Sequence, residues 1–128
     1  MIDRQLRVLT ERIQSACKQV GRNPKEVELV LVTKEVEPQR IREGYELGIR
    51  DFGETRVQEL VAKRKELPKD IKWHFIGHLQ TNKVKLLIGQ AVLIHSCDRL
   101  ELAQELEKQA AKHDQEVDVL LEVNTSGE

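Results

Sequence analysis

Hydrophobic positions along the chain alternate between helical spacing and short continuous runs. Over residues 3–20, apolar side chains recur at helical spacing among charged ones, which predicts an amphipathic helix ended by Gly21 and Asn23-Pro24. The apolar face of this helix would consist of Leu6, Leu9, Ile13, Ala16, Cys17 and Val20. The next segment, VELVLVTK at 27–34, is rich in valine and leucine and too short for an isolated helix. Such a run is typical of a parallel strand that is buried on both faces.

The alternation continues through the rest of the chain. Short apolar runs predict further strands at 49–53, 71–77, 91–96 and 117–127. Pro38 predicts the start of a helix that ends near Gly48. Three later helices, one of them running from residue 55 to about 67 and another over 99–113, are expected to begin at capping residues. These caps are Thr55 paired with Gln58, Thr81, and Asp98 with Glu101 in an acidic first turn.

Strands and helices that alternate with short connections indicate a parallel α/β fold. The connections leave no room for a second domain, so we expect residues 1–128 to form a single domain. Two architectures fit the pattern. An open doubly wound sheet needs no further strands, whereas a closed (β/α)8 barrel usually takes about 250 residues and would lack its last three strands here. Periodicity alone does not choose between them.

The composition narrows the classes of function. Lys and Arg number 21 against 22 Asp and Glu, and aromatic residues make up 3% of the chain. Neither a basic face nor a stacking platform is therefore expected, so nucleic acid is not a predicted partner. No apolar run is long enough to cross a bilayer, and the charged amphipathic start is unlike a signal peptide. We expect a cytoplasmic protein whose Cys17 and Cys97 are reduced, small core residues.

Ligands of both architectures bind at the C-terminal ends of the strands. The polar residues predicted at those ends are Thr33, Lys34, Glu54, Thr55, His78, His95, Ser96, Asp98, Asn124, Thr125 and Ser126. Lys34 is the most suggestive, because a lysine that follows an apolar strand can be desolvated and can then add to a carbonyl as a neutral amine. Schiff-base enzymes and pyridoxal phosphate (PLP) proteins use this chemistry. A solvated lysine at a strand end is the commoner situation for this residue type.

Two histidines, His74 and His78, have the four-residue spacing of paired zinc ligands on a helix. On a strand the same spacing separates them by roughly 13 Å, too far to share a metal, so no metal site is predicted. His74 is expected to be a core residue with a satisfied ring, and His78, beside Gly77, is the better functional candidate. Asn124 lies on the expected functional rim, although NTSGE could equally form an Asx turn.

Several stretches together resemble one known family. LVLVTK, FGETRVQEL, IKWHFIGHLQTNKVK, DRLELAQEL and VLLEVNTSGE are similar, in order and spacing, to the PLP homeostasis protein family, also called the YggS/PROSC family. The resemblance implies a (β/α)8 barrel like the N-terminal domain of bacterial alanine racemase, here with about five parallel strands. It implies PLP as cofactor, with Lys34 as the Schiff-base residue, and a PLP carrier rather than an enzyme. Thr55, His78 and Asn124 complete the expected cofactor contacts.

The sequence departs from the family in two respects. The family usually reads FGEN followed by an aromatic residue, whereas Thr55 and Arg56 stand here. Family members also continue for about another hundred residues, as an eight-stranded barrel requires. The resemblance places the phosphate-binding segments in that part, so weak PLP affinity is expected of this chain. Its first and fifth strands would have unpaired edges, which predicts self-association or pairing with a complementing C-terminal half.

Two other functions remain open at this point. One is a PLP-dependent racemase-like enzyme, since the barrel is shared with alanine racemase; such enzymes add a second domain with a catalytic tyrosine. The other is an α/β module without a cofactor that binds a partner through an exposed sheet edge.

Overall fold

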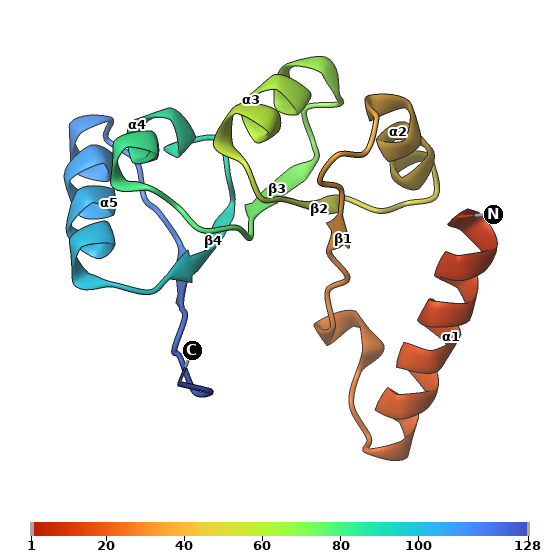
Figure 1. The fold of residues 1–128 in the computed structure, drawn as a ribbon. Coiled ribbons are helices and arrows are strands. Elements are labelled where there is room, and N and C mark those ends of the chain that lie inside the picture. Colours follow the sequence, from red (N-terminus) through yellow and green to blue (C-terminus); the bar gives the residue numbers. More distant parts are fainter. Residues whose placement is uncertain (1, 128) are drawn as a thin grey trace.

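The computed structural model describes residues 2–127, which form one curved sheet with helices packed against it (Figure 1). The strands are β1 (Leu31–Val32), β2 (Asp51–Glu54), β3 (Lys72–Phe75), β4 (Leu93–Cys97) and β5 (Val119–Leu121). The α-helices are α1 (Ile2–Gln19), α2 (Pro38–Glu46), α3 (Val57–Glu66), α4 (Val84–Leu87) and α5 (Leu100–Lys112). Two 3-10 helices, η1 (Pro24–Glu26) and η2 (Thr81–Lys83), complete the set. The predicted alternation of helix and strand is confirmed.

The strand order decides between the two architectures that the sequence left open. The five strands lie in the order β1-β2-β3-β4-β5, and each pairs in parallel with its neighbour in the chain. A doubly wound sheet would reverse its order at a switch point, whereas a barrel adds each strand beside the one before it. The sheet is therefore of the barrel type, as the resemblance implied.

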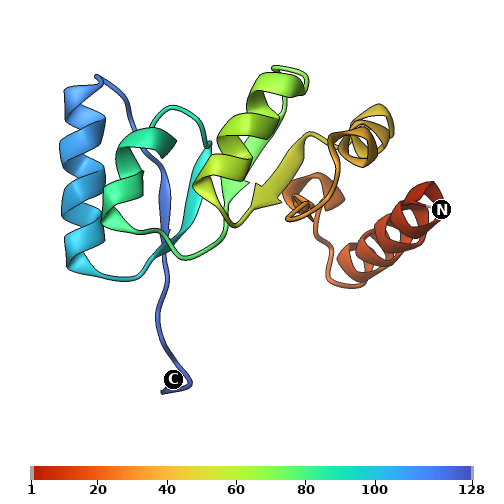
Figure 2. The same cartoon turned by 45° about the horizontal axis from the view of Figure 1, so that its top comes forward.

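The hydrophobic core lies between the sheet and the helices α2 to α5, which follow one another along one face of the sheet (Figures 1 and 2). Phe52 on β2 and Trp73 on β3 are fully buried, and their ring centroids are 5.9 Å apart. Leu60 of α3 and Leu102 of α5 belong to the same core on the helix side and are equally buried. This layer fixes the strands and so positions the residues at their ends.

The first helix lies beside α2 near the β1 edge of the sheet, and much of its predicted apolar face remains accessible (Figure 1). Cys17 is buried, while Leu9 and Val20 are exposed. Cys97 is also buried, so the prediction that both cysteines are small core residues is confirmed. None of the helices within residues 2–127 combines the length and the apolar character that crossing a membrane requires.

The first strand is shorter and more exposed than its sequence predicts. The expected strand at 27–34 would be buried on both faces, but β1 consists of Leu31–Val32 and 53% of Val32 is exposed. The prediction is wrong because β1 is an edge strand, which among residues 2–127 pairs only with β2. The other strands are also shorter than the predicted apolar runs, and β2 and β4 each end one residue beyond their run.

The three predicted helix caps are also wrong. The N-cap residues are Arg56 for α3 and Arg99 for α5, neither with a capping side-chain bond, and Gln80 precedes η2 where Thr81 was expected to cap. Thr55 cannot cap α3 because the chain stays extended through Arg56, at φ −125° and ψ 133°. Asp98 is occupied elsewhere, since its carboxylate accepts a 2.8 Å hydrogen bond from Arg99.

Candidate functional site

Lys34 lies just beyond β1, at the C-terminal edge of the sheet, as predicted. Val32 pairs with Gly53, and the N–H of Thr33 continues the ladder with a 2.9 Å bond to the carbonyl of Gly53. This register brings Lys34 to the level of Thr55 on the neighbouring strand. Both residues lie just beyond their strands, Lys34 in a turn and Thr55 in a bend, and Glu54, the residue before Thr55, contacts Lys63 of α3.

The Lys34 side chain is exposed, which is the commoner of the two situations expected for a lysine at a strand end. An edge strand has a neighbour on one side only, and β1 has β2 alone among residues 2–127 to shield the lysine. Within the same residues the Lys34 amine has no hydrogen bond or ion pair. The amine is thus accessible to a ligand at the strand end.

A tight turn carries Lys34. The carbonyl of Thr33 accepts a 3.0 Å bond from the N–H of Val36, which closes the turn around Lys34 and Glu35. Glu35 has a φ of 61°, in the left-handed region that a residue with a side chain seldom adopts. The neighbours of Lys34 on both sides are therefore held in a defined backbone conformation.

A charged cluster formed by Glu54, Glu59 and Lys63 contacts this turn; Glu54 and Lys63 are buried and Glu59 is half-buried. The Lys63 ammonium donates to Glu54 Oε2 at 2.9 Å and to Glu59 Oε2 at 3.4 Å. Glu54 has no exposed surface, and its Oε1 atom has no hydrogen-bond partner among the described residues. Glu54 was expected at a strand end, whereas Lys63 was not among the expected site residues. Lys63 lies three residues after the buried Leu60 and so on the inner side of α3.

The electrostatics of the two carboxylates differ. Burial raises the pKa of Glu54, and the bonds from Thr33 and Lys63 offset this effect only in part. Burial also acts to raise the pKa of Glu59, but the N–H of Glu35 and the charge of Lys63 outweigh it, so the pKa of Glu59 is lowered. Glu59, the more accessible of the two carboxylates, therefore ionises more readily than Glu54.

Thr55 and His78 meet at one pocket, at the ends of β2 and β3. The pocket has a volume of 180 Å³, and its other lining residues are Arg56, Val57, Gln58, Phe75, Gln80 and Lys83. His78 is exposed and Thr55 is half-buried. A Cβ atom added at Gly77 would lie only 2.8 Å from the Cα atom of Thr55, so the chain passes very close to the neighbouring strand here. The structure thus brings these two predicted site residues together.

Asn124 lies beyond β5, at the other edge of the sheet from Lys34. Its Oδ1 atom accepts a 2.9 Å bond from the N–H of Gly127, and its side chain is exposed. This is the turn that the NTSGE segment allowed. Among residues 2–127 the sheet holds Asn124 and Lys34 at opposite edges, with three strands between their own.

His74 is a buried residue whose two ring nitrogens are both satisfied, as predicted. Nε2 is 2.9 Å from Asp51 Oδ1 and Nδ1 is 2.9 Å from His95 Nε2, which links β2, β3 and β4. Burial and the neighbouring His74 lower the pKa of His95. No group of three His, Cys, Asp or Glu side chains within the described chain could hold a metal ion.

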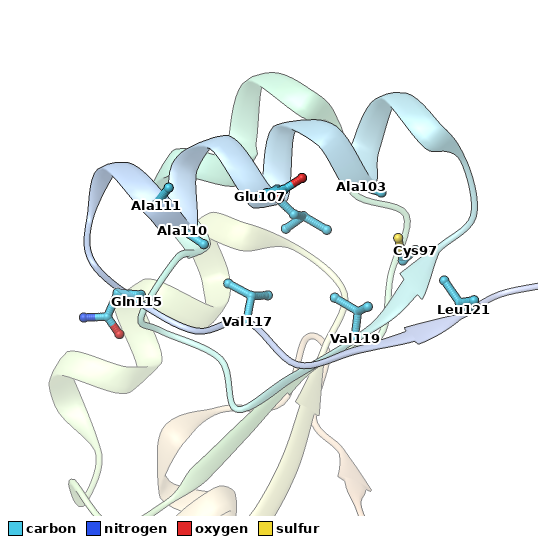
Figure 3. A pocket seen from close by; sticks show the side chains of 10 residues that line it. Cys97, Ala103, Glu107, Ala110, Ala111, Gln115, Val117, Val119 and Leu121 are labelled. Atoms are coloured by element: carbon cyan, nitrogen blue, oxygen red, sulfur yellow. The ribbon is translucent and has the colours of Figure 1, made fainter.

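A separate apolar groove of 440 Å³ runs between α5 and β5 (Figure 3). Val117, Val119 and Leu121 line it from the strand side, and Ala103, Ala110 and Ala111 from the helix. With Glu107 and Gln115 as its polar lining residues, the groove offers little for a charged ligand. It is a packing surface at the β5 edge rather than part of the rim that carries Lys34.

The sequence model of the family described as alanine racemase, N-terminal domain, matches residues 6–128. The chain belongs to this family. It is 51% identical over 127 residues to the pyridoxal phosphate homeostasis protein of Aquifex aeolicus, covering 98% of this chain and 55% of the relative. The corresponding protein of Pseudomonas aeruginosa is 40% identical, over 91% of this chain and 51% of its own. The chain thus spans about half the length of the curated relatives it matches.

Solved structures of family relatives have the same fold. A protein of unknown function from Bifidobacterium adolescentis aligns with a TM-score of 0.90 at 32% identity, over 99% of this chain and 56% of its own. PipY of Synechococcus elongatus PCC7942, solved with PLP bound, aligns at 0.71 and 38% identity, over 86% of this chain and 51% of its own. The expected family, fold class and family cofactor are thereby confirmed.

Proposed function

We propose that this protein binds PLP covalently through Lys34 and belongs to a PLP carrier or homeostasis protein rather than to an enzyme. The observation that carries the proposal is the accessible Lys34 amine, free of bonds to residues 2–127, at the C-terminal edge of a barrel-type sheet. Relatives named for PLP homeostasis, and one solved with PLP bound, support the choice of cofactor.

The residues at the rim fit the aldehyde end of PLP. When bound, the cofactor would supply an electrophilic aldehyde carbon, with which a neutral lysine amine can condense with loss of one water. Lys34 provides that nitrogen, and the open rim leaves room for a ligand beside it. Thr55 and His78 line the pocket at the ends of β2 and β3 and are proposed to donate or accept hydrogen bonds with the cofactor. Asn124 is proposed as a contact from the opposite edge of the sheet.

Tyr45 lies away from the rim that carries Lys34. Tyr45 is the one tyrosine in the sequence, and it lies on α2. Its hydroxyl donates a 2.6 Å bond to Asp70, which precedes β3, and its ring lies 3.8 Å from the guanidinium of Arg50, which precedes β2. Both contacts are at the N-terminal ends of the strands, so this tyrosine cannot serve as a proton donor or acceptor at the rim.

Reductive trapping tests the proposal. The purified chain is mixed with PLP and reduced with borohydride, and the modified peptide is identified by mass spectrometry. We expect the label on Lys34, and its loss in Lys34→Ala but not in Lys72→Ala, an exposed lysine at the N-terminal end of β3. Unchanged labelling of Lys34→Ala would reject the assignment. Racemisation of alanine above background, measured by chiral chromatography, would reject the carrier function.

The open edges of the sheet support a second proposal, about partners. β1 and β5 each pair with one strand, and Leu121 and Val123 are 76% and 72% exposed. We propose that these edges bind either a second copy of the chain or a complementing C-terminal half. A cytoplasmic location stays a prediction.

A further inference from the structure

The charged cluster of Glu54, Glu59 and Lys63 holds both neighbours of Lys34. The Lys63 ammonium donates a 2.8 Å bond to the carbonyl of Thr33, and the hydroxyl of Thr33 donates to Glu54 Oε2. On the other side of Lys34, the N–H of Glu35 donates to both oxygens of Glu59, at 3.2 and 3.3 Å. One cluster on β2 and α3 thus forms hydrogen bonds with the residue before the lysine and with the residue after it.

Stability alone does not account for this cluster. Burying charges costs several kcal/mol per ion, and well-packed apolar residues often replace a buried ion pair without loss. Here one carboxylate oxygen, Glu54 Oε1, lacks a partner among the described residues, which adds to the cost. All three protons of the Lys63 ammonium have acceptors, on Thr33, Glu54 and Glu59. The directions of these three hydrogen bonds are therefore defined. The bonds fix the geometry of the cluster more than they stabilise the fold.

The turn needs such restraint. Glu35 has a φ of 61°, and a non-glycine residue in this region costs about 1 to 3 kcal/mol. The Lys34 side chain makes no hydrogen bond or ion pair with residues 2–127. The backbone conformation at 33–35 alone therefore determines the direction in which this side chain leaves the main chain. Whatever holds Thr33 and Glu35 therefore also directs Lys34.

We propose that Glu54, Glu59 and Lys63 are positioning residues that hold the 33–36 turn and present the Lys34 amine to an incoming aldehyde. The inference rests on the proposed function, since it assigns Lys34 as the residue that captures PLP. None of the three side chains needs to touch the cofactor. They act through the backbone on either side of Lys34.

Amide hydrogen exchange at Glu35, measured by NMR without PLP, tests whether the hydrogen bonds to Glu59 hold the turn. We expect exchange about tenfold or more faster in Glu59→Ala, because the N–H loses its acceptor. Glu59→Gln keeps an acceptor oxygen and should restore most of the protection. Glu66→Ala, an exposed glutamate on the same helix, is the matched control and should leave Glu35 unchanged. Equal exchange in Glu59→Ala and the unaltered chain would overturn the inference.

The rate of PLP capture tests the consequence. Trapping by borohydride at timed intervals should be about fivefold or more slower in Glu59→Ala and close to normal in Glu59→Gln. The double variant Glu54→Gln with Lys63→Met removes both buried charges together, avoids leaving one unpaired, and should also be slow. Lys65→Met, an exposed neighbour on α3, controls for loss of a positive charge.

These measurements distinguish a failure of the positioning role from a failure of the proposed function. If the unaltered chain labels Lys34 but Glu59→Ala captures PLP at the same rate, the positioning role is wrong and the proposed function stands. If the unaltered chain does not label Lys34 at all, the proposed function fails and the positioning role fails with it. Circular dichroism and thermal unfolding on every variant confirm that each rate is measured on folded protein.

Discussion

At the scale of single residues, Gly77 sets how closely β3 and β2 approach at the rim. A Cβ atom placed there would lie 2.8 Å from the Cα atom of Thr55 and 2.9 Å from its carbonyl carbon. Both are backbone atoms of the neighbouring strand and cannot move aside as a flexible side chain would. The glycine therefore allows Thr55 and His78 to line the same pocket.

Gly77→Ala should consequently destabilise the fold by about 1 to 3 kcal/mol, because the backbone must shift to admit the methyl group. Gly53→Ala is the matched control. Its Cβ would meet only side-chain methyl groups, of Ile76 at 3.2 Å and Val30 at 3.3 Å, which can give way. Urea unfolding followed by circular dichroism measures both, and an equal loss in the two variants would contradict the backbone clash.

At the scale of elements, one polar chain of Asp51, His74 and His95 joins three neighbouring strands. Each strand contributes one side chain, and the bonds run from the carboxylate to the buried imidazole and on to the second imidazole. His74 Nδ1 and His95 Nε2 are 2.9 Å apart, so one of these two nitrogens donates and the other accepts, and they cannot both carry a proton. The strands are thereby linked through side chains as well as through their backbones.

This linkage predicts a loss of stability in acid. Burial and His74 lower the pKa of His95 below its usual 6.5, so the unfolded chain takes up a proton at a higher pH than the folded one. The contribution of His95 to the free energy of unfolding is present above pH 6.5 and is lost as the pH falls through its lowered pKa.

Urea unfolding at about pH 7.5 and about pH 5.5 measures the effect. His95→Gln should lose less stability between the two values than the unaltered chain does. His78→Gln, which changes an exposed histidine, should keep the full pH dependence. If His95→Gln and the unaltered chain lose the same amount, another group is responsible.

At the scale of the whole molecule, the sheet is a barrel segment with two open edges. Leu121 on β5 lines the apolar groove against α5 and is 76% exposed (Figure 3). Burying such a side chain in a contact contributes about 1.5 to 3 kcal/mol. A proposed partner that buries Leu121 at the β5 edge would therefore be bound more tightly by this free energy.

Sedimentation equilibrium should therefore show association above the 14.8 kDa of one chain as the concentration rises. Leu121→Lys should weaken it by about tenfold or more. Leu100→Lys is the control, because Leu100 is 72% exposed but begins α5 and does not line the groove. Equal association of both variants would show that the β5 edge is not the contact.

Much of the fold and some of the site could be predicted from the sequence. Lys34, Thr55 and His78 do lie at the ends of their strands, because an apolar run followed by polar residues marks a strand end locally. The predicted caps were wrong, because residue propensity alone favours Thr55 and Asp98 as N-caps. The extended backbone at Arg56 and the hydrogen bond from Arg99 to Asp98 are evident only in the structure. The exposure of Lys34 agrees with the commoner situation for a lysine at a strand end, and among residues 2–127 it follows from the absence of a strand on the outer side of β1.

The sequence by itself determined the alternation of helices and strands and the chemistry at their ends. Both follow from hydrogen bonding and hydrophobic spacing over a few residues, which any local stretch displays. Only the tertiary structure decided the strand order, the link from Asp51 to His95, and the grip of Glu59 and Lys63 on the turn around Lys34. These features join residues some 20 to 30 positions apart, as in the bond between Lys63 and Thr33, 30 residues apart. Such pairs have no local signature, because they form only when separate elements pack together.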